Sequence, residues 1–246
     1  MKKTQTIFQD GTHKWVAIVR DPERPDSLID TNEYLVANGV QGLILDPGGA
    51  EIFPAVFSAL AAEFDPSAVV GLFASHQDPD IISSLAMWLE FNPKMHCYPS
   101  WLWESFIPHF GGTSDTFVPI PDEGMEIGLN GLTLTAVPAH YLHSSGNFHL
   151  YDRQARMYFS GDVGAALLPP EEAGLFVEDF DRHIKHAEGF HRRWMGSNEA
   201  KRRWCERVAQ MEIDMLCPQH GAIYQGADVQ RFINWFDELQ VGILRG

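Results

Sequence analysis

Short apolar runs, each closed by a turn or a polar loop, recur through the first half of the chain. The run at 14–19 predicts a strand, and the runs on either side of Ala37-Asn38-Gly39 predict a hairpin over 33–36 and 42–45. Apolar positions with helical spacing predict a helix over 52–63. Strand and helix patterns therefore alternate, which is typical of an α/β fold.

The next apolar run, 68–74, predicts a buried strand that ends at a loop carrying His76. A helix is expected over 81–91, because apolar side chains from Ile81 onward share one face. Asp80 stands directly before this helix, where aspartate is a common N-cap. Taken alone, Asp80 would be explained by that capping role.

The second half repeats the alternation. Strands are predicted over 132–137, 148–151, 156–160 and 213–217, mostly helical sequence over 171–210, and a final helix over about 228–240. No Gly/Ser-rich or Pro-rich linker interrupts the sequence, so residues 1–246 are predicted to form one domain.

Potential metal ligands follow four of the predicted strands: His76, Asp78 and Asp80, then His143, then Asp162, then His220. Strand ends in a layered α/β fold can meet at one sheet edge, where ligand sites usually lie. Within 76–80, alternation places all three side chains on one side of an extended segment. Such groups would repel or desolvate one another unless a cation lay between them, so the set predicts a metal site.

Three imidazoles and three carboxylates are too many for one four-coordinate structural zinc. They suit two ions that share a bridging carboxylate and keep positions for water or a small ligand. Oxygen and imidazole donors without cysteine favour iron or manganese, and zinc is not excluded. Two ferrous ions, and two ferric ions with bound peroxide, give this site the same net charge, so the donor set permits dioxygen binding.

Composition narrows the function classes. The net charge is −15, with 33 acidic and 18 basic residues, which argues against binding to nucleic acid or to anionic membranes. Neither a signal peptide nor a membrane-spanning run is visible. The three cysteines form no CxxC pair, which favours a reduced, cytoplasmic protein.

The ordered set His-x-Asp-x-Asp, His, Asp, His resembles the metallo-β-lactamase-fold diiron proteins over roughly residues 30–225. It is most similar to the flavodiiron core and, within it, to the stand-alone oxygen-binding diiron proteins. The resemblance implies a four-layer αββα sandwich. Hydrolytic members usually carry His where this chain has Asp78, and an acid there is the family's mark of iron and redox chemistry.

The resemblance also implies roles for single residues. The first iron would be held by His76, Asp78 and His143, the second by Asp80 and His220, with Asp162 bridging both. His143 is preferred to His140 because its spacing to Asp162 and the following Ser144–Phe148 segment fit the family loop better. His140 then either surrounds the ligands or is a plain loop histidine. Phe148 could line the pocket, and Asn32 could orient a ligand, although a turn residue is the simpler interpretation of Asn32.

Two departures from the family bear on function. The flavodiiron motif usually places His after its second Asp, but here the residue is Ile81, which cannot bind a metal. We therefore expect an open or water-filled position at the second iron, on a more apolar side that suits a neutral diatomic ligand. The second departure is the absence of a flavodoxin domain and of a phosphate-binding glycine loop, so no flavin is expected on this chain.

The leading hypothesis is a diiron protein that binds dioxygen as a ferric peroxo adduct and serves as an oxygen sensor or carrier. The alternatives are a reductase of dioxygen or nitric oxide fed by an external electron donor, and a metal-dependent hydrolase such as a phosphodiesterase. Dioxygen or another diatomic is the implied ligand, and a signalling or electron-donor protein the implied partner. The sequence leaves open whether the chain forms a homodimer.

The remaining histidines and the basic run have simpler interpretations. His183, His186 and His191 are expected on a solvated helix face, and Lys201-Arg202-Arg203 on a helix surface. His96 and His109 lie in an aromatic-rich stretch and are expected to pack rather than bind a metal.

Overall fold

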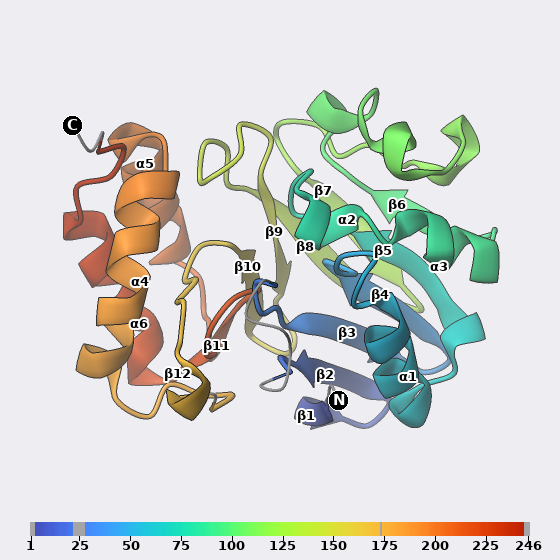
Figure 1. Cartoon of the computed structure of the whole chain (residues 1–246), viewed down its shortest axis with the longest axis horizontal. Helices are drawn as coiled ribbons and strands as arrows, with labels where there is room; N and C mark the ends of the chain where they lie inside the picture. The colour runs from blue at the N-terminus through green and yellow to red at the C-terminus, as the bar shows by residue number, and fades with distance from the viewer. Residues whose placement is uncertain (1–2, 22–27, 173, 244–246) are drawn as a thin grey trace. The chain divides into compact units, whose positions relative to one another are not determined.

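The computed structural model describes residues 3–21, 28–172 and 174–243, which belong to two compact units, 1–136 and 137–246 (Figure 1). The single domain expected over 1–246 stays a prediction. None of the helices in the described part of the chain combines the length and apolarity needed to cross a bilayer.

The first unit is built on a sheet in which six strands follow one another in chain order. The strands are β1 (Lys3–Asp10), β2 (His13–Val19), β3 (Glu33–Asn38), β4 (Gln41–Leu45), β5 (Val69–Phe73) and β6 (His96–Tyr98). The first four pair antiparallel, whereas β4, β5 and β6 pair parallel. A hairpin of β7 (Met125–Leu129) and β8 (Leu132–Pro138) follows. The predicted strands over 14–19, 33–36, 42–45 and 68–74 are therefore confirmed, although β1 and β7 lacked a clear apolar pattern.

Helices α1 (Phe53–Glu63) and α3 (Leu85–Phe91) cover apolar side chains of this sheet (Figure 1). Trp88 is fully buried and contacts the rings of Phe53 and Phe57. The helix predicted over 81–91 is wrong in one respect, because it is broken at Ser83-Ser84 into α2 (Pro79–Ile82) and α3. The Ser84 hydroxyl donates to the carbonyl of Gly48 at 2.7 Å, so a bond to the neighbouring loop fixes the break.

The second unit has strands in the order β12-β11-β10-β9, with helices α4 to α6 gathered beside them (Figure 1). Their bounds are β9 (Phe148–Asp152), β10 (Met157–Gly161), α4 (Phe180–Trp194), α5 (Asn198–Val208), β11 (Met215–Pro218), β12 (Tyr224–Gln225) and α6 (Ala227–Glu238). Strands β9 and β10 are antiparallel, whereas β10 and β11 are parallel. Ser197 caps α5 by accepting from the backbone N–H of Ala200 at 3.1 Å.

Three polar residues expected on helix surfaces are instead buried: His183 is 5% exposed, His191 0% and Lys201 2%. The Lys201 ammonium donates to the carbonyls of Phe236 and Asp237 at the end of α6, where a cation also complements the helix dipole. His191 lies among the rings of Phe232, Trp235 and Phe236. The surface interpretation of these three side chains is therefore wrong, because each finds hydrogen-bond or ring partners inside the second unit.

Candidate metal centre

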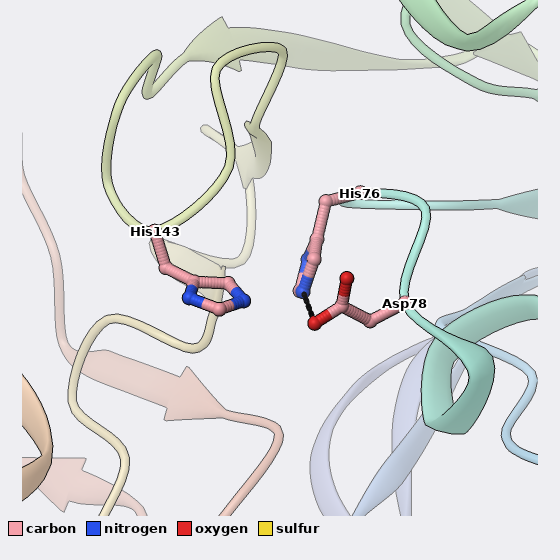
Figure 2. Close-up of side chains that lie close together, drawn as sticks. All are labelled: His76, Asp78 and His143. Atoms are coloured by element: carbon pink, nitrogen blue, oxygen red, sulfur yellow. Dashed lines mark ion pairs between the residues drawn. The ribbon is translucent and has the colours of Figure 1, made fainter. Parts of the chain in front are cut away.

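The first group of candidate ligands lies where β5 leaves the sheet of the first unit. Because β4, β5 and β6 are parallel, their carboxyl ends share one edge, and the chain turns there into the His76 loop. His76 is 1% exposed, and its Nε2 lies 3.6 Å from Oδ2 of Asp78 (Figure 2). We name His76, Asp78 and Asp80 the first donor group.

A hydrogen-bond chain fixes the tautomer of His76. The Ser75 hydroxyl donates to Oδ2 of Asp46 at 2.6 Å, so towards His76 Nδ1, 2.9 Å away, that hydroxyl can only accept. Nδ1 therefore carries the ring proton, and Nε2 carries the lone pair that a metal ion needs. Asp46 is fully buried and also accepts from the backbone N–H of Ser75 at 2.7 Å, which holds the chain in place.

The two carboxylates of the first donor group lie on either side of Pro79. Asp78, not Asp80, is the N-cap residue of α2, and its side chain makes no capping hydrogen bond. Its Oδ1 instead accepts from Nε2 of Gln77 at 3.1 Å. Asp80 lies in the first turn of α2 and is half-buried. The N-cap interpretation of Asp80 is therefore wrong.

The second group of candidate ligands comes from the ends of two parallel strands and one loop in the second unit. Gly161 at the end of β10 is in register with Pro218 at the end of β11, so the next residues of the two strands leave the sheet side by side. Asp162 and His220 are 5% and 2% exposed. With His143, from the loop between β8 and β9, they form the second donor group.

Each oxygen of the Asp162 carboxylate faces a different imidazole. Oδ1 lies 3.4 Å from Nε2 of His220, and Oδ2 lies 3.8 Å from Nε2 of His143. These separations exceed a hydrogen bond, but two donors bound at about 2.1 Å to one ion at 90–110° are themselves about 3.0–3.4 Å apart. An aspartate with one imidazole on each oxygen has the geometry of a carboxylate that bridges two ions.

The His143 loop is held by its own polar groups and by α4. The Asn147 amide donates to the carbonyl of Leu142, and the backbone N–H of Asn147 donates to that of Ser144 at 3.3 Å. The His143 ring, shown on its loop in Figure 2, lies 5.1 Å from the ring of Trp194. The loop thereby limits the directions in which the imidazole can point.

The residues predicted to surround the ligands have mixed placements. His140 contacts the buried ring of Phe148 edge-on at 5.0 Å. Asn32 is fully buried, and its Oδ1 accepts from the backbone N–H of Arg20 at 3.2 Å. Ile81 is fully buried in the apolar cluster of the first unit. Their roles towards a metal ligand stay predictions.

The donor chemistry fits metal ions better than a purely structural polar network. Each donor group combines imidazole and carboxylate. His76, Asp162 and His220 are buried, and the free-energy cost of burying such groups is one that a cation would offset. Sequence reasoning missed Asp46 and Ser75, which orient His76, because Asp46 opens the segment Asp46-Pro47-Gly48-Gly49, whose residue types are typical of a plain turn. The position of Ser75 directly before His76 was the only available signal.

Comparison with known proteins identifies the family to which the chain is similar. The model of the family described as "ODP family beta lactamase" matches residues 29–221. A structure of the chemotaxis sensor ODP, described as a peroxy diiron species, is 38% identical, with a TM-score of 0.87 over 98% of this chain and 96% of that one. The apo state of the sensor from T. denticola has the same identity and coverage, with a TM-score of 0.88. Among the curated proteins, none matches this chain.

More distant structures share the fold. A flavo di-iron protein from Thermotoga maritima is 22% identical with a TM-score of 0.81, and this chain covers 61% of it. The rubredoxin oxygen:oxidoreductase from Desulfovibrio gigas is 17% identical with a TM-score of 0.82. These matches and the family match confirm the predicted metallo-β-lactamase-like α/β fold class.

Proposed function

This chain belongs to the ODP family of beta-lactamase-fold proteins, and from that premise we propose that it is a non-haem diiron protein that binds dioxygen and acts as an oxygen sensor. The observation that carries the proposal is the Asp162 carboxylate, with one imidazole nitrogen beside each of its oxygens. A bridging carboxylate is the feature that a two-ion site needs and a single-ion site does not.

On this proposal, the two donor groups hold one pair of irons. His76, Asp78 and His143 would hold the first, Asp80 and His220 would hold the second, and Asp162 would be shared between them. Three supporting features are the lone pair that Ser75 directs to Nε2 of His76, the oxygen and nitrogen donors that suit iron, and the sequence identity to a diiron sensor. Manganese or zinc is the alternative content of the same site.

The irons supply the dioxygen-binding chemistry, and the chain's own residues prepare the site for them. Asp46 and Ser75 hold His76 in the metal-binding tautomer, and Asn147 and Trp194 restrict the His143 ring. Ile81 offers no donor atom after Asp80, which leaves a coordination position for an exogenous ligand. We also place the protein in the cytoplasm, where reduced thiols persist, because Cys97, Cys205 and Cys217 are all buried and free.

The test is iron loading under anaerobic conditions, followed by controlled exposure to air. We expect two ferrous ions per chain, a new visible absorption band on exposure, and its loss when dioxygen is removed. Asp162→Asn should lower the affinity for the second iron at least tenfold. Asp152→Asn is the matched control, because Asp152 is fully buried but caps a turn, where its Oδ1 accepts from the backbone N–H of Gln154 and of Ala155.

The outcomes separate the candidate functions. A loaded protein that stays colourless and inert in air would rule out the proposal. Continuous dioxygen or nitric oxide consumption with a rubredoxin-like donor would identify a reductase instead. Turnover of phosphodiesters without any response to air would identify a hydrolase.

A further inference from the structure

His191 is a buried histidine whose two nitrogens have opposite hydrogen-bonding roles. Its Nδ1 lies 2.8 Å from the carbonyl oxygen of Ala187, which can only accept, so Nδ1 carries a proton. Its Nε2 lies 2.9 Å from the backbone nitrogen of Gly164, which can only donate, so Nε2 is unprotonated. The two partners therefore specify one neutral tautomer without reference to any metal.

Gly164 lies two residues after Asp162, in a loop that several hydrogen bonds hold in place. The Ser160 hydroxyl donates to the carbonyl of Val163 at 2.6 Å, and the backbone N–H of Ala165 donates to the carbonyl of Asp162 at 3.1 Å. At Gly164 itself the carbonyl accepts from the Tyr224 hydroxyl at 3.1 Å. The backbone N–H of Gly164 is bound by the His191 imidazole, which therefore joins α4 to the loop that presents Asp162.

The same turn of α4 also touches the third segment of the second donor group. Trp194 lies 5.1 Å from the His143 ring, and Phe190, stacked on Trp194, lies 6.3 Å from it. Phe190 and Trp194 therefore contact the His143 ring, and His191 on the same turn contacts the Asp162 loop. A displacement of this turn would change the separation between His143 and Asp162.

We propose that His191 is a positioning residue: its unprotonated Nε2 holds the Gly164 N–H and thereby keeps the Asp162 carboxylate directed between His143 and His220. This inference rests on the proposed function only in so far as Asp162 binds metal. The tautomer and the clamp on Gly164 belong to the chain without metal and can be tested there.

Two amide variants separate positioning from mere packing. In His191→Gln, the amide oxygen reaches about as far as Nε2 did, so an acceptor for Gly164 is retained. In His191→Asn, the shorter side chain reaches only as far as Nδ1, so the Ala187 bond is retained and the Gly164 bond is lost. Lys201→Met is the control for general destabilisation, because it removes buried hydrogen bonds of the same unit far along the chain from the Asp162 loop.

The first measurement uses the protein without metal. Histidine ¹⁵N spectra should show the Nδ1–H tautomer at His191, and amide exchange at Gly164 should be slow in the wild type and in His191→Gln. In His191→Asn, Gly164 exchange should accelerate at least tenfold relative to the wild type. Fast Gly164 exchange in the wild type, or the opposite tautomer, would overturn the inference whatever the fate of the proposed function.

The second measurement is an anaerobic ferrous titration of the same proteins. His191→Asn should bind the second ion at least tenfold more weakly, whereas His191→Gln and Lys201→Met should stay within threefold of the wild type. Wild-type affinity in His191→Asn, or an equal loss in Lys201→Met, would show that His191 does not position Asp162. A wild type that binds fewer than two ions would instead count against the proposed function.

Discussion

Gly221, the residue after His220, allows the strictest test of how the second donor group is held. Its φ is +88°, and a Cβ added there would lie 2.9 Å from the backbone nitrogen, the backbone oxygen and the Cβ of Ala166. The same backbone nitrogen of Ala166 donates to the carbonyl of His220 at 3.2 Å. Gly221→Ala therefore forces either Ala166 or His220 to move.

Gly131 provides a matched control, with a φ of +87° and no heavy atom within 4 Å of an added Cβ. Gly131→Ala should cost only the positive-φ strain, about 1–2 kcal/mol of unfolding free energy. Gly221→Ala should cost that strain plus about 1–3 kcal/mol for overpacking against backbone that cannot rotate away. Urea-induced unfolding of both variants measures the difference.

The same pair of variants should separate stability from metal binding. Metal–ligand distances tolerate only about 0.2 Å of change, so a displaced His220 should weaken the second iron at least tenfold in Gly221→Ala. Gly131→Ala should titrate like the wild type. Equal unfolding free energies for the two variants, or unchanged iron affinity in Gly221→Ala, would refute this account of how His220 is placed.

Three further predictions follow from buried groups. Burial lowers the pKa of His191 from 6.5 to about 4, so as the pH falls this imidazole is protonated in the unfolded chain before it is protonated in the folded protein. The unfolding free energy should therefore fall by about 3 kcal/mol between pH 7 and pH 4, and His191→Phe should flatten that part of a urea-measured pH profile. Lys201→Met leaves two carbonyls at the end of α6 without their hydrogen-bond donor and should lower the unfolding free energy by about 2–4 kcal/mol in the same urea assay. A loss below about 0.5 kcal/mol would contradict these hydrogen bonds. Burial raises the pKa of the thiols of Cys97, Cys205 and Cys217, to about 12 for Cys97 and Cys205. A thiol reagent should therefore label the native protein only as fast as it unfolds, as measured by mass spectrometry. Rapid labelling of any of the three would contradict this prediction.

The sequence predicted the strands that carry the donor residues because those strands are short, apolar and bounded by turns. The run at 68–74 becomes β5 (Val69–Phe73), and the strand predicted over 156–160 becomes β10 (Met157–Gly161). The first ends three residues before His76, and the second ends directly before Asp162. The break of the helix over 81–91 was not predictable from spacing, because it depends on the bond between Ser84 and Gly48, which are distant in sequence.

The interior of the second unit was harder to predict because its polar members look like surface residues. Lys201 stands in a basic run, yet it is buried together with Trp204, Cys205 and Val208, which share its helix face. Helical spacing alone could have identified that face. The burial of His191 has the same signal in the spacing of α4, but its acceptor role required knowing that the Gly164 N–H packs against it.

The second donor group is held by main-chain bonds that require no metal. The backbone N–H of Gln219, directly before His220, donates to the carbonyl of Gly161, directly before Asp162, at 2.8 Å. Such preorganisation predicts little change of fold when ions bind, because few groups remain to be ordered. This chain matches the apo and the peroxy diiron structures of the related sensor almost equally, with TM-scores of 0.88 and 0.87. We therefore expect iron binding to change local contacts of the ligand loops, such as the contact between the His143 ring and Trp194 at 5.1 Å, rather than the fold.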